Sequence, residues 1–168
     1  MKLGDGVEQA IHSITLLAGL PADGLLSAQA LAAFHGVSTS YLLKHLQALS
    51  GAGIVKTTPG PNGGYELGKP PEKISLLDIV LAVEGPEPAF RCREIRQQGY
   101  APLPKEHFTA PCQINAAMLR AERAYRRELA AVSIADLMCE LAADDDGTIT
   151  ARGCAFFDQY MRRPKSRT

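Results

Sequence analysis

Glu8 and His12 are the first residues whose types and spacing could do chemistry. They stand four positions apart in residues 6–17, where apolar residues recur with helical spacing. On a helix this separation places both side chains on one face, beside the apolar stripe. A carboxylate and an imidazole on one face supply half of a metal site. The same spacing also fits a surface hydrogen bond between the two side chains, so both interpretations remain open.

Cys92 and Cys112 form a second candidate pair. They lie 20 positions apart in a proline-rich segment, residues 86–112, that shows little periodicity. A long irregular segment inside a compact chain is usually functional or disordered. Thiolates hold soft metals and iron–sulfur clusters, whereas an unligated cysteine is commonly a small buried residue. The pair therefore indicates either two ligands or two packing residues.

The composition of the chain indicates the cellular compartment in which these residues would act. No apolar run approaches the roughly 20 residues that span a bilayer, and the N-terminus leads into an amphipathic helix, not a signal peptide. We therefore expect a cytoplasmic protein with no membrane partner. Disulfides are rare in that compartment, so metal ligation or redox sensing is favoured over a disulfide framework for the four cysteines.

Residues 27–67 predict a compact structural unit of two helices and a hairpin. A helix over residues 27–35, a turn at residues 36–37 and a second helix capped by Ser38 form a helix-turn-helix. A strand at residues 54–57 and a second at residues 65–67 flank a glycine-rich tip, which predicts a hairpin wing. The composite pattern is typical of a winged helix-turn-helix that binds DNA; a purely structural helix pair with a hairpin is the alternative.

The face of the second helix that its leucines leave free carries polar groups suited to phosphates and base edges. Lys and Arg together number 18, equal to Asp and Glu, so DNA affinity must come from local placement of charge. Candidate DNA-binding residues on this helix and the wing are Ser38, Thr39, Ser40, Tyr41, Lys44, Gln47, Lys56, Thr58, Asn62 and Gly63.

Helical patterns continue on both sides of the cysteine-bearing segment. Ser75 and Asp78 have capping-box form for a helix that ends at Glu84. Residues 113–131 predict a long helix with a stripe that needs a partner surface, and a shorter helix follows from Ser133. Periodicity is lost towards the basic C-terminus. The fold class is therefore mainly α with a small β-hairpin.

The chain contains five motifs that together carry a family resemblance: Ser38-x-x-Tyr41-Leu-x-Lys44, Gln47-Ala-Leu-Ser-Gly-Ala-Gly53-Ile-Val, Gly63-Gly-Tyr65-x-Leu67, Pro70-Pro71-x-x-Ile74-x-Leu76-x-Asp78 and Ala82-Val-Glu-Gly-Pro86. Through these motifs the chain resembles, from Met1 to about Leu141, the Rrf2 family of bacterial winged-helix regulators. The resemblance implies a non-enzymatic homodimer, joined through the long helix, that binds a dyad-symmetric operator in double-stranded DNA and needs no small-molecule substrate.

Many cluster-binding members of the family carry three closely spaced cysteines, and this chain has none between Cys92 and Cys112. Its Glu8, His12, Cys92 and Cys112 instead resemble the RsrR-type redox-sensing subgroup. That resemblance implies a two-iron, two-sulfur (2Fe-2S) cluster held by glutamate and histidine from one subunit and two cysteines from the other. Gln9 stands where the subgroup would lead us to expect an aromatic residue.

Together these features predict a redox-sensing transcription regulator with four regions: a winged DNA-binding domain (1–85), a cysteine-bearing cluster loop (86–112), dimerisation helices (113–143) and a flexible C-terminal tail (144–168). Two alternatives remain within the same fold. One is a cluster-free regulator that senses through thiols or a partner protein. The other uses the same four ligands for structural zinc.

Overall fold

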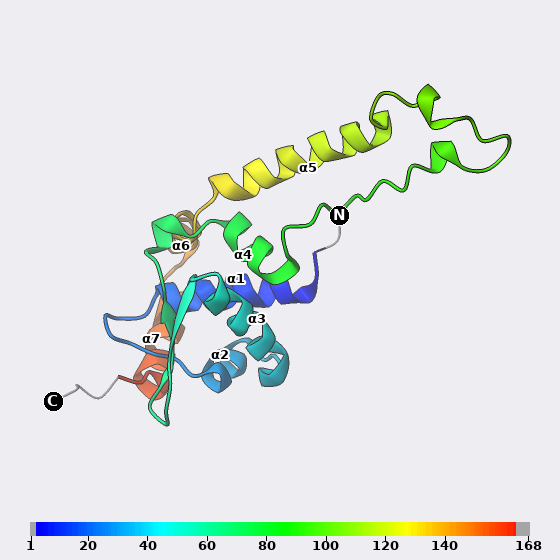
Figure 1. Ribbon diagram of the computed structural model, residues 1–168. Helices are drawn as coiled ribbons and strands as arrows, with labels where there is room; N and C mark the ends of the chain where they lie inside the picture. The colour runs from blue at the N-terminus through cyan, green and yellow to red at the C-terminus, as the bar shows by residue number, and fades with distance from the viewer. Residues whose placement is uncertain (1–2, 164–168) are drawn as a thin grey trace.

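The computed structural model describes residues 3–163 of the chain. The N-terminal half of the chain forms most of a helical body, and a long helix with an irregular loop extends away from this body as an arm (Figure 1). Its helices and strands are α1 (Asp5–Ala18), α2 (Ala28–His35), α3 (Thr39–Gly51), β1 (Val55–Thr58), β2 (Gly64–Leu67), α4 (Leu76–Glu84), α5 (Gln113–Ala131), α6 (Ile134–Asp144) and α7 (Thr148–Tyr160). Short 3-10 turns are η1 (Pro71–Lys73), η2 (Ile95–Gln97) and η3 (Lys105–His107). The predicted fold class, mainly α with one hairpin, is confirmed.

The core lies where α1, α2, α3 and α4 meet. Leu42, Leu46 and Leu49 on α3 are fully buried, as their spacing predicted. Burial of a side chain of this size stabilises the fold by about 1.5–3 kcal/mol. Ile14 of α1 and Ile134 of α6 lie in the same cluster, so the core ties the N-terminal helix and the C-terminal region to the DNA-binding unit.

The helix-turn-helix has the predicted order with one local difference. The Ser27 hydroxyl accepts a hydrogen bond from the Ala30 backbone N–H at 3.1 Å, and Gly36 ends α2 with a φ of 66°. That left-handed conformation favours glycine. Ser38 precedes α3, but its hydroxyl bonds the Ser40 hydroxyl at 3.0 Å and makes no capping bond to the backbone.

The wing is a two-stranded antiparallel hairpin in which Val55 pairs with Leu67 and Thr58 with Gly64. A Cβ atom at Gly63 would overlap the Thr58 carbonyl oxygen, so only glycine fits at this point of the turn. Leu26, just before α2, exchanges two backbone hydrogen bonds with Tyr65 of β2. The wing is therefore attached to the helical body through its second strand.

Two capping boxes hold the base of the arm. Ser75 and Asp78 form the predicted box at the start of α4, and Ser133 and Asp136 form a second at the start of α6. Ser75 and Ser133 also form a bridge, with the Leu76 backbone N–H donating to the Val132 carbonyl at 3.0 Å. The two helix starts are thus pinned together directly below α5.

The structure differs from the expected flexible tail over residues 144–168, because Thr148–Tyr160 form α7. Asp145 accepts hydrogen bonds from the backbone N–H groups of Gly147, Ile149 and Thr150, which nucleates the helix. Phe156 packs on Phe34 with ring centroids 4.8 Å apart. Tertiary packing on α2, more than a long apolar stripe, stabilises this helix. The last basic residues, from position 164 onward, lie outside the described part of the chain.

None of the helices within residues 3–163 combines the length and the apolar character needed to cross a membrane.

We predict that Phe157→Ala lowers the free energy of unfolding by about 1–3 kcal/mol, less than the roughly 3–5 kcal/mol that truncation of a fully buried phenylalanine costs. Phe157 is half-buried and lies against Gly19 of the body. Asp158→Ala, at the next and exposed position, is the control and should change stability by less than about 0.5 kcal/mol. Urea unfolding measures both variants. Equal stability of the two would restore the flexible-tail interpretation.

Candidate functional site

The structure brings Cys92 and Cys112 together across the irregular loop. Their sulfur atoms and a carboxylate oxygen of Glu94 all lie within 4.8 Å of one another, and all three residues are half-buried. The Cys92 thiol donates to Glu94 Oε1 at 3.7 Å. The predicted thiol pair is therefore a pair in space, and it offers two sulfur atoms and one oxygen to a common centre.

Glu94 is the member of this group that the sequence analysis missed. Its φ of 50° places a non-glycine residue in the left-handed region, a conformation that often marks functional sites. Arg96 fixes the turn, because its Nε donates to Glu94 Oε2 at 2.7 Å and its Nη2 to the Ala110 carbonyl at 2.7 Å. The only signal in the sequence is a carboxylate two positions after a cysteine, which is too common to identify a ligand.

A partly buried ion pair on α5 holds the start of the cysteine loop. Glu122 is only 8% exposed, and its Oε1 pairs with Arg126 Nη2 at 2.6 Å. Glu122 Oε2 accepts from the Ala89 backbone N–H at 3.0 Å, and Arg126 donates to the Pro86 carbonyl at 2.9 Å. Both charges are thus satisfied by each other and by the loop backbone. The pair sets the direction in which the loop leaves α4.

The two thiols have different acidities. The backbone N–H of Asn115, in the first turn of α5, favours the Cys112 thiolate and lowers its pKa. At Cys92 the Glu94 backbone N–H also favours the thiolate, but partial desolvation and the neighbouring Cys112 together raise its pKa. Cys112 is therefore the better candidate for the first metal contact.

Glu8 and His12 both lie exposed on α1, one helical turn apart. Within a single chain, over residues 3–163, they are not part of the Cys92–Glu94–Cys112 group. The His12 ring lies 5.5 Å from the ring of His35, at the end of α2. Burial lowers the pKa of His35, with His12 and Arg152 adding to the effect. His12 thus packs against the last residue of α2, next to the turn of the helix-turn-helix.

Helix α3, the second helix of the helix-turn-helix and below called the recognition helix, also meets α1 at one close contact. The His45 imidazole of α3 lies so near Gly6 of α1 that a Cβ atom there would overlap the ring. Tyr41 packs edge-on against His45 with ring centroids 4.7 Å apart. Burial lowers the pKa of His45, and Lys44 contributes in the same direction. A shift of α1 would therefore displace the His45 ring and, through it, the Tyr41 side chain on α3.

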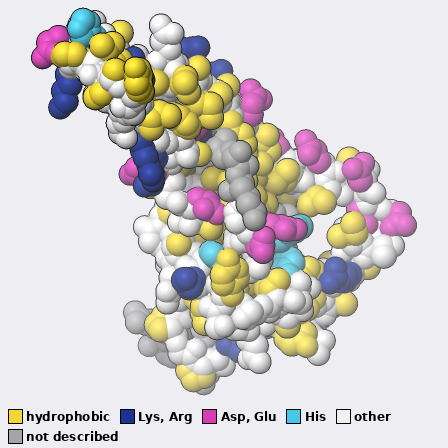
Figure 2. Space-filling view, turned by 90° about the vertical axis from the view of Figure 1, so that its right-hand side faces the viewer, with side chains coloured by type: hydrophobic (Ala, Val, Ile, Leu, Met, Phe, Trp, Pro, Cys, Tyr) yellow, Lys and Arg dark blue, Asp and Glu magenta, His cyan; other side chains and the backbone are white. Residues whose placement is uncertain are grey.

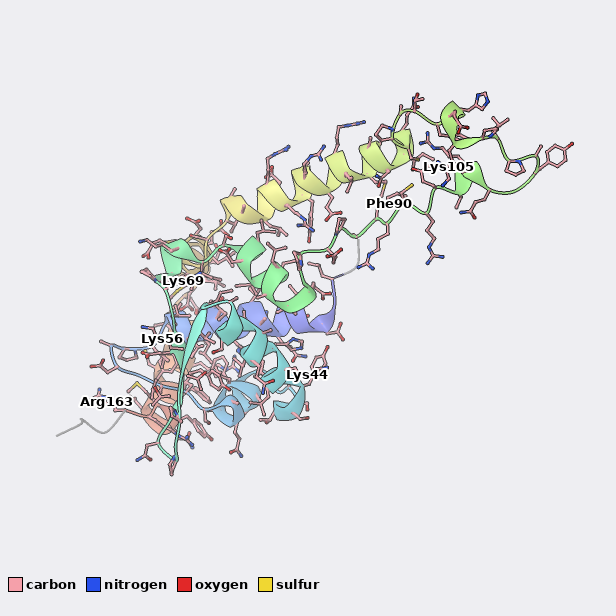
Figure 3. All side chains as sticks on the ribbon, viewed as in Figure 1. Lys44, Lys56, Lys69, Phe90, Lys105 and Arg163 are labelled. Atoms are coloured by element: carbon pink, nitrogen blue, oxygen red, sulfur yellow. The ribbon has the colours of Figure 1, made fainter. Side chains whose placement is uncertain are left out.

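Seven of the ten predicted DNA-binding residues are exposed at the start of α3, along it or on the wing, with Lys44 and Lys56 labelled in Figure 3. Thr39 and Thr58 are half-buried, and Gly63 is buried. Gly63 therefore shapes the wing turn and offers little surface to a ligand. The exposed members are Ser38, Ser40, Tyr41, Lys44, Gln47, Lys56 and Asn62.

A sequence model of the Rrf2 family, described as "Iron-dependent Transcriptional regulator", matches residues 3–140. The chain belongs to the Rrf2 family. It is 36% identical over 141 residues to the HTH-type transcriptional regulator YffB of Lactococcus lactis, a match that covers 83% of this chain and 88% of that relative. Proteins of this family are DNA-binding transcription regulators, typically dimeric, and not enzymes.

Solved structures confirm the fold of this Rrf2 protein. CymR, the global cysteine regulator of Bacillus subtilis, superimposes with a TM-score of 0.65 at 24% identity, covering 83% of this chain and 98% of CymR. The IscR structure titled "T. potens IscR" superimposes with a TM-score of 0.64 at 19% identity, covering 90% of this chain and 96% of IscR. At these identities the two structures show the fold alone, so the sensed signal must be inferred from the residues of the site.

We predict that, in the reduced and metal-free protein, alkylation of Cys112 reaches half of its maximal rate at a lower pH than alkylation of Cys92. Only the thiolate reacts, and the pKa of Cys112 is lowered while that of Cys92 is raised. Iodoacetamide labelling followed by peptide mass spectrometry gives both profiles, with the exposed Cys139 and Cys154 as internal controls. A reversed order of the two profiles would contradict the geometry described for the loop.

Proposed function

We propose that this Rrf2 protein is a homodimer that senses redox state through a 2Fe-2S cluster. Glu8 and His12 of one subunit and Cys92 and Cys112 of the other are its proposed ligands. The observation that carries the proposal is the division of the donor set. Two thiols converge on the arm, while a carboxylate and an imidazole stand exposed on α1.

The chemistry of the donors fits such a cluster. Thiolates are its usual protein ligands, and replacing part of the thiolate set by histidine raises the reduction potential. When bound, the cluster supplies a site that gains or loses an electron near the DNA-binding unit. The protein residues hold it: Cys112 at the start of α5, Cys92 in the loop that Arg96 closes, and the α1 pair on a rigid helix.

The surface of α5 supports a dimer. With 19 residues it is about 28 Å long, and it packs against α4. Ile114 is 66% exposed and Met118 is 44% exposed, and both lie near the N-terminal end of α5, which Cys112 precedes. Figure 2 shows hydrophobic side chains gathered over this upper part of the molecule. A second copy that covers this stripe would bring the cysteine arm of one subunit towards α1 of the other.

The same arrangement suggests how a signal would reach DNA. His12 lies against His35 at the end of α2, and Gly6 lies against His45 of α3. A change of charge at the α1 ligands would therefore act on two contacts of the DNA-binding unit. Operator half-sites lie about 34–36 Å apart or at multiples of it, so a small change in the spacing of two recognition helices alters affinity. The proposed contacts with DNA are those of the exposed residues on α3 and the wing.

Structural zinc is a second candidate, and Glu94 is the observation that favours it. Two thiolates and a carboxylate from one chain supply three of the four ligands of a tetrahedral zinc site. Such a zinc site would hold the loop in place, but the charge of the site would not change with redox state. Iron and sulfide content separates the two candidates.

Subunit complementation tests the cluster and its position together. We predict that oxygen-free purification of the wild type yields visible absorbance, iron and acid-labile sulfide. The E8A/H12A and C92S/C112S double variants should each lose all three. A heterodimer of the two variants, isolated with two different affinity tags, retains one complete ligand set and should recover half of the wild-type iron. Cys139→Ser, at an exposed position on α6, is the control and should keep full content.

A colourless wild type that holds only zinc would overturn the cluster. A heterodimer without iron, beside a loaded wild type, would instead place all ligands within one subunit and overturn the shared site.

A further inference from the structure

The C-terminal segment, beyond the residues matched by the family, docks on the DNA-binding unit. The family match ends at residue 140, and α7 begins at Thr148. The Arg152 guanidinium lies 4.4 Å from the centre of the Phe34 ring, and its Nη2 donates to the Phe34 carbonyl at 3.2 Å. The segment is thus held against α2 by cation–π, aromatic and hydrogen-bonding contacts.

Beyond α7 the chain joins the wing. The backbone N–H and carbonyl of Arg162 both bond Leu25 at 2.8 Å, and the adjacent Leu26 bonds Tyr65 of β2. Backbone hydrogen bonds therefore run from β1 through β2 and residues 25–26 to Arg162. Arg162 is thus linked to the two-stranded wing through two isolated β-bridges.

The Arg162 side chain holds the wing turn itself. Its Nη1 donates to the carbonyls of Pro61 and Gly63, each at 3.0 Å. These carbonyls belong to the tip, where Gly60 has a φ of 104° and the chain reverses. A guanidinium that bonds two carbonyls of one turn fixes its shape at the cost of side-chain entropy. A solvated charge run would leave this arginine free.

The charges that follow suit an anionic partner. After Asp158 the chain contains Arg162, Arg163, Lys165 and Arg167 and no acidic residue. Arg163 is exposed, and Lys56 is exposed on β1 of the wing. Figure 3 labels both on the side of the molecule where the wing lies. The phosphates of duplex DNA are the anions that the wing would meet.

We propose that the C-terminal segment is part of the DNA-binding interface: Arg162 positions the wing turn, and Arg163 beside it contacts a DNA phosphate. This inference rests on the proposed DNA contacts of the wing.

Salt-dependent binding of the full-length protein to a labelled random-sequence duplex of about 30 base pairs tests the phosphate contact. Arg163→Gln should weaken binding and lower the slope of log K against log salt concentration by about 0.9 for each phosphate that the variant no longer neutralises. Arg120→Gln removes the same charge from α5 and is the matched control. It should bind as the wild type does.

The positioning role has its own readout. Arg162→Ala should weaken binding several-fold and speed amide exchange at the wing-turn residues that carry a backbone N–H, which are Gly60, Asn62, Gly63 and Gly64. Arg162→Lys, which keeps a charged donor, should recover part of both. If Arg163→Gln and both Arg162 variants match the wild type at every salt concentration, the inference is wrong. If the wild type itself fails to bind the duplex at low salt, DNA binding by the wing is overturned as well.

Discussion

The close packing of α1 against α3 is the constraint on which the rest of the structure depends. Gly6 and Ala10 leave room for the two helices to approach, and the His45 ring fills the space beside Gly6. Because one face of α1 is buried in the core, its other face holds Glu8 and His12 in fixed directions. Close-packed interiors transmit small displacements and do not absorb them. Any ligand of Glu8 or His12 therefore acts on a helix that is mechanically joined to the recognition helix.

The arm holds two thiols together without the support of the core, because it extends away from the helical body. Buried charges are tolerated only when they are paired and hydrogen-bonded, and Glu122 and Arg126 meet this condition by binding the loop backbone. Loss of either partner would leave an uncompensated charge and free the loop. The ion pair thus fixes the loop that carries Cys92, as packing in the core fixes the α1 helix that carries Glu8 and His12.

Regular patterns in the sequence predicted most of the body. Leu42, Leu46 and Leu49 recur at helical spacing and are buried together, and the box formed by Ser75 and Asp78 was visible from local chemistry alone. Features that depend on distant contacts were missed. Glu94 becomes a candidate ligand only when the loop closes, and Arg126 meets the Pro86 carbonyl, which lies 40 positions away along the chain. The helix α7 owes its stability to packing on Phe34, a contact 122 positions away from Phe156 along the chain.

Electron transfer to the proposed site on α1 and the arm should change the affinity of the protein for DNA. This coupling can be measured on an operator selected from a random duplex library with cluster-loaded protein. The dissociation constant is then measured by fluorescence anisotropy for oxidised and reduced protein at one salt concentration. We expect the two constants to differ by about 5–150-fold, the usual range of coupling between sites. Equal constants, with the cluster retained in both states, would contradict this coupling.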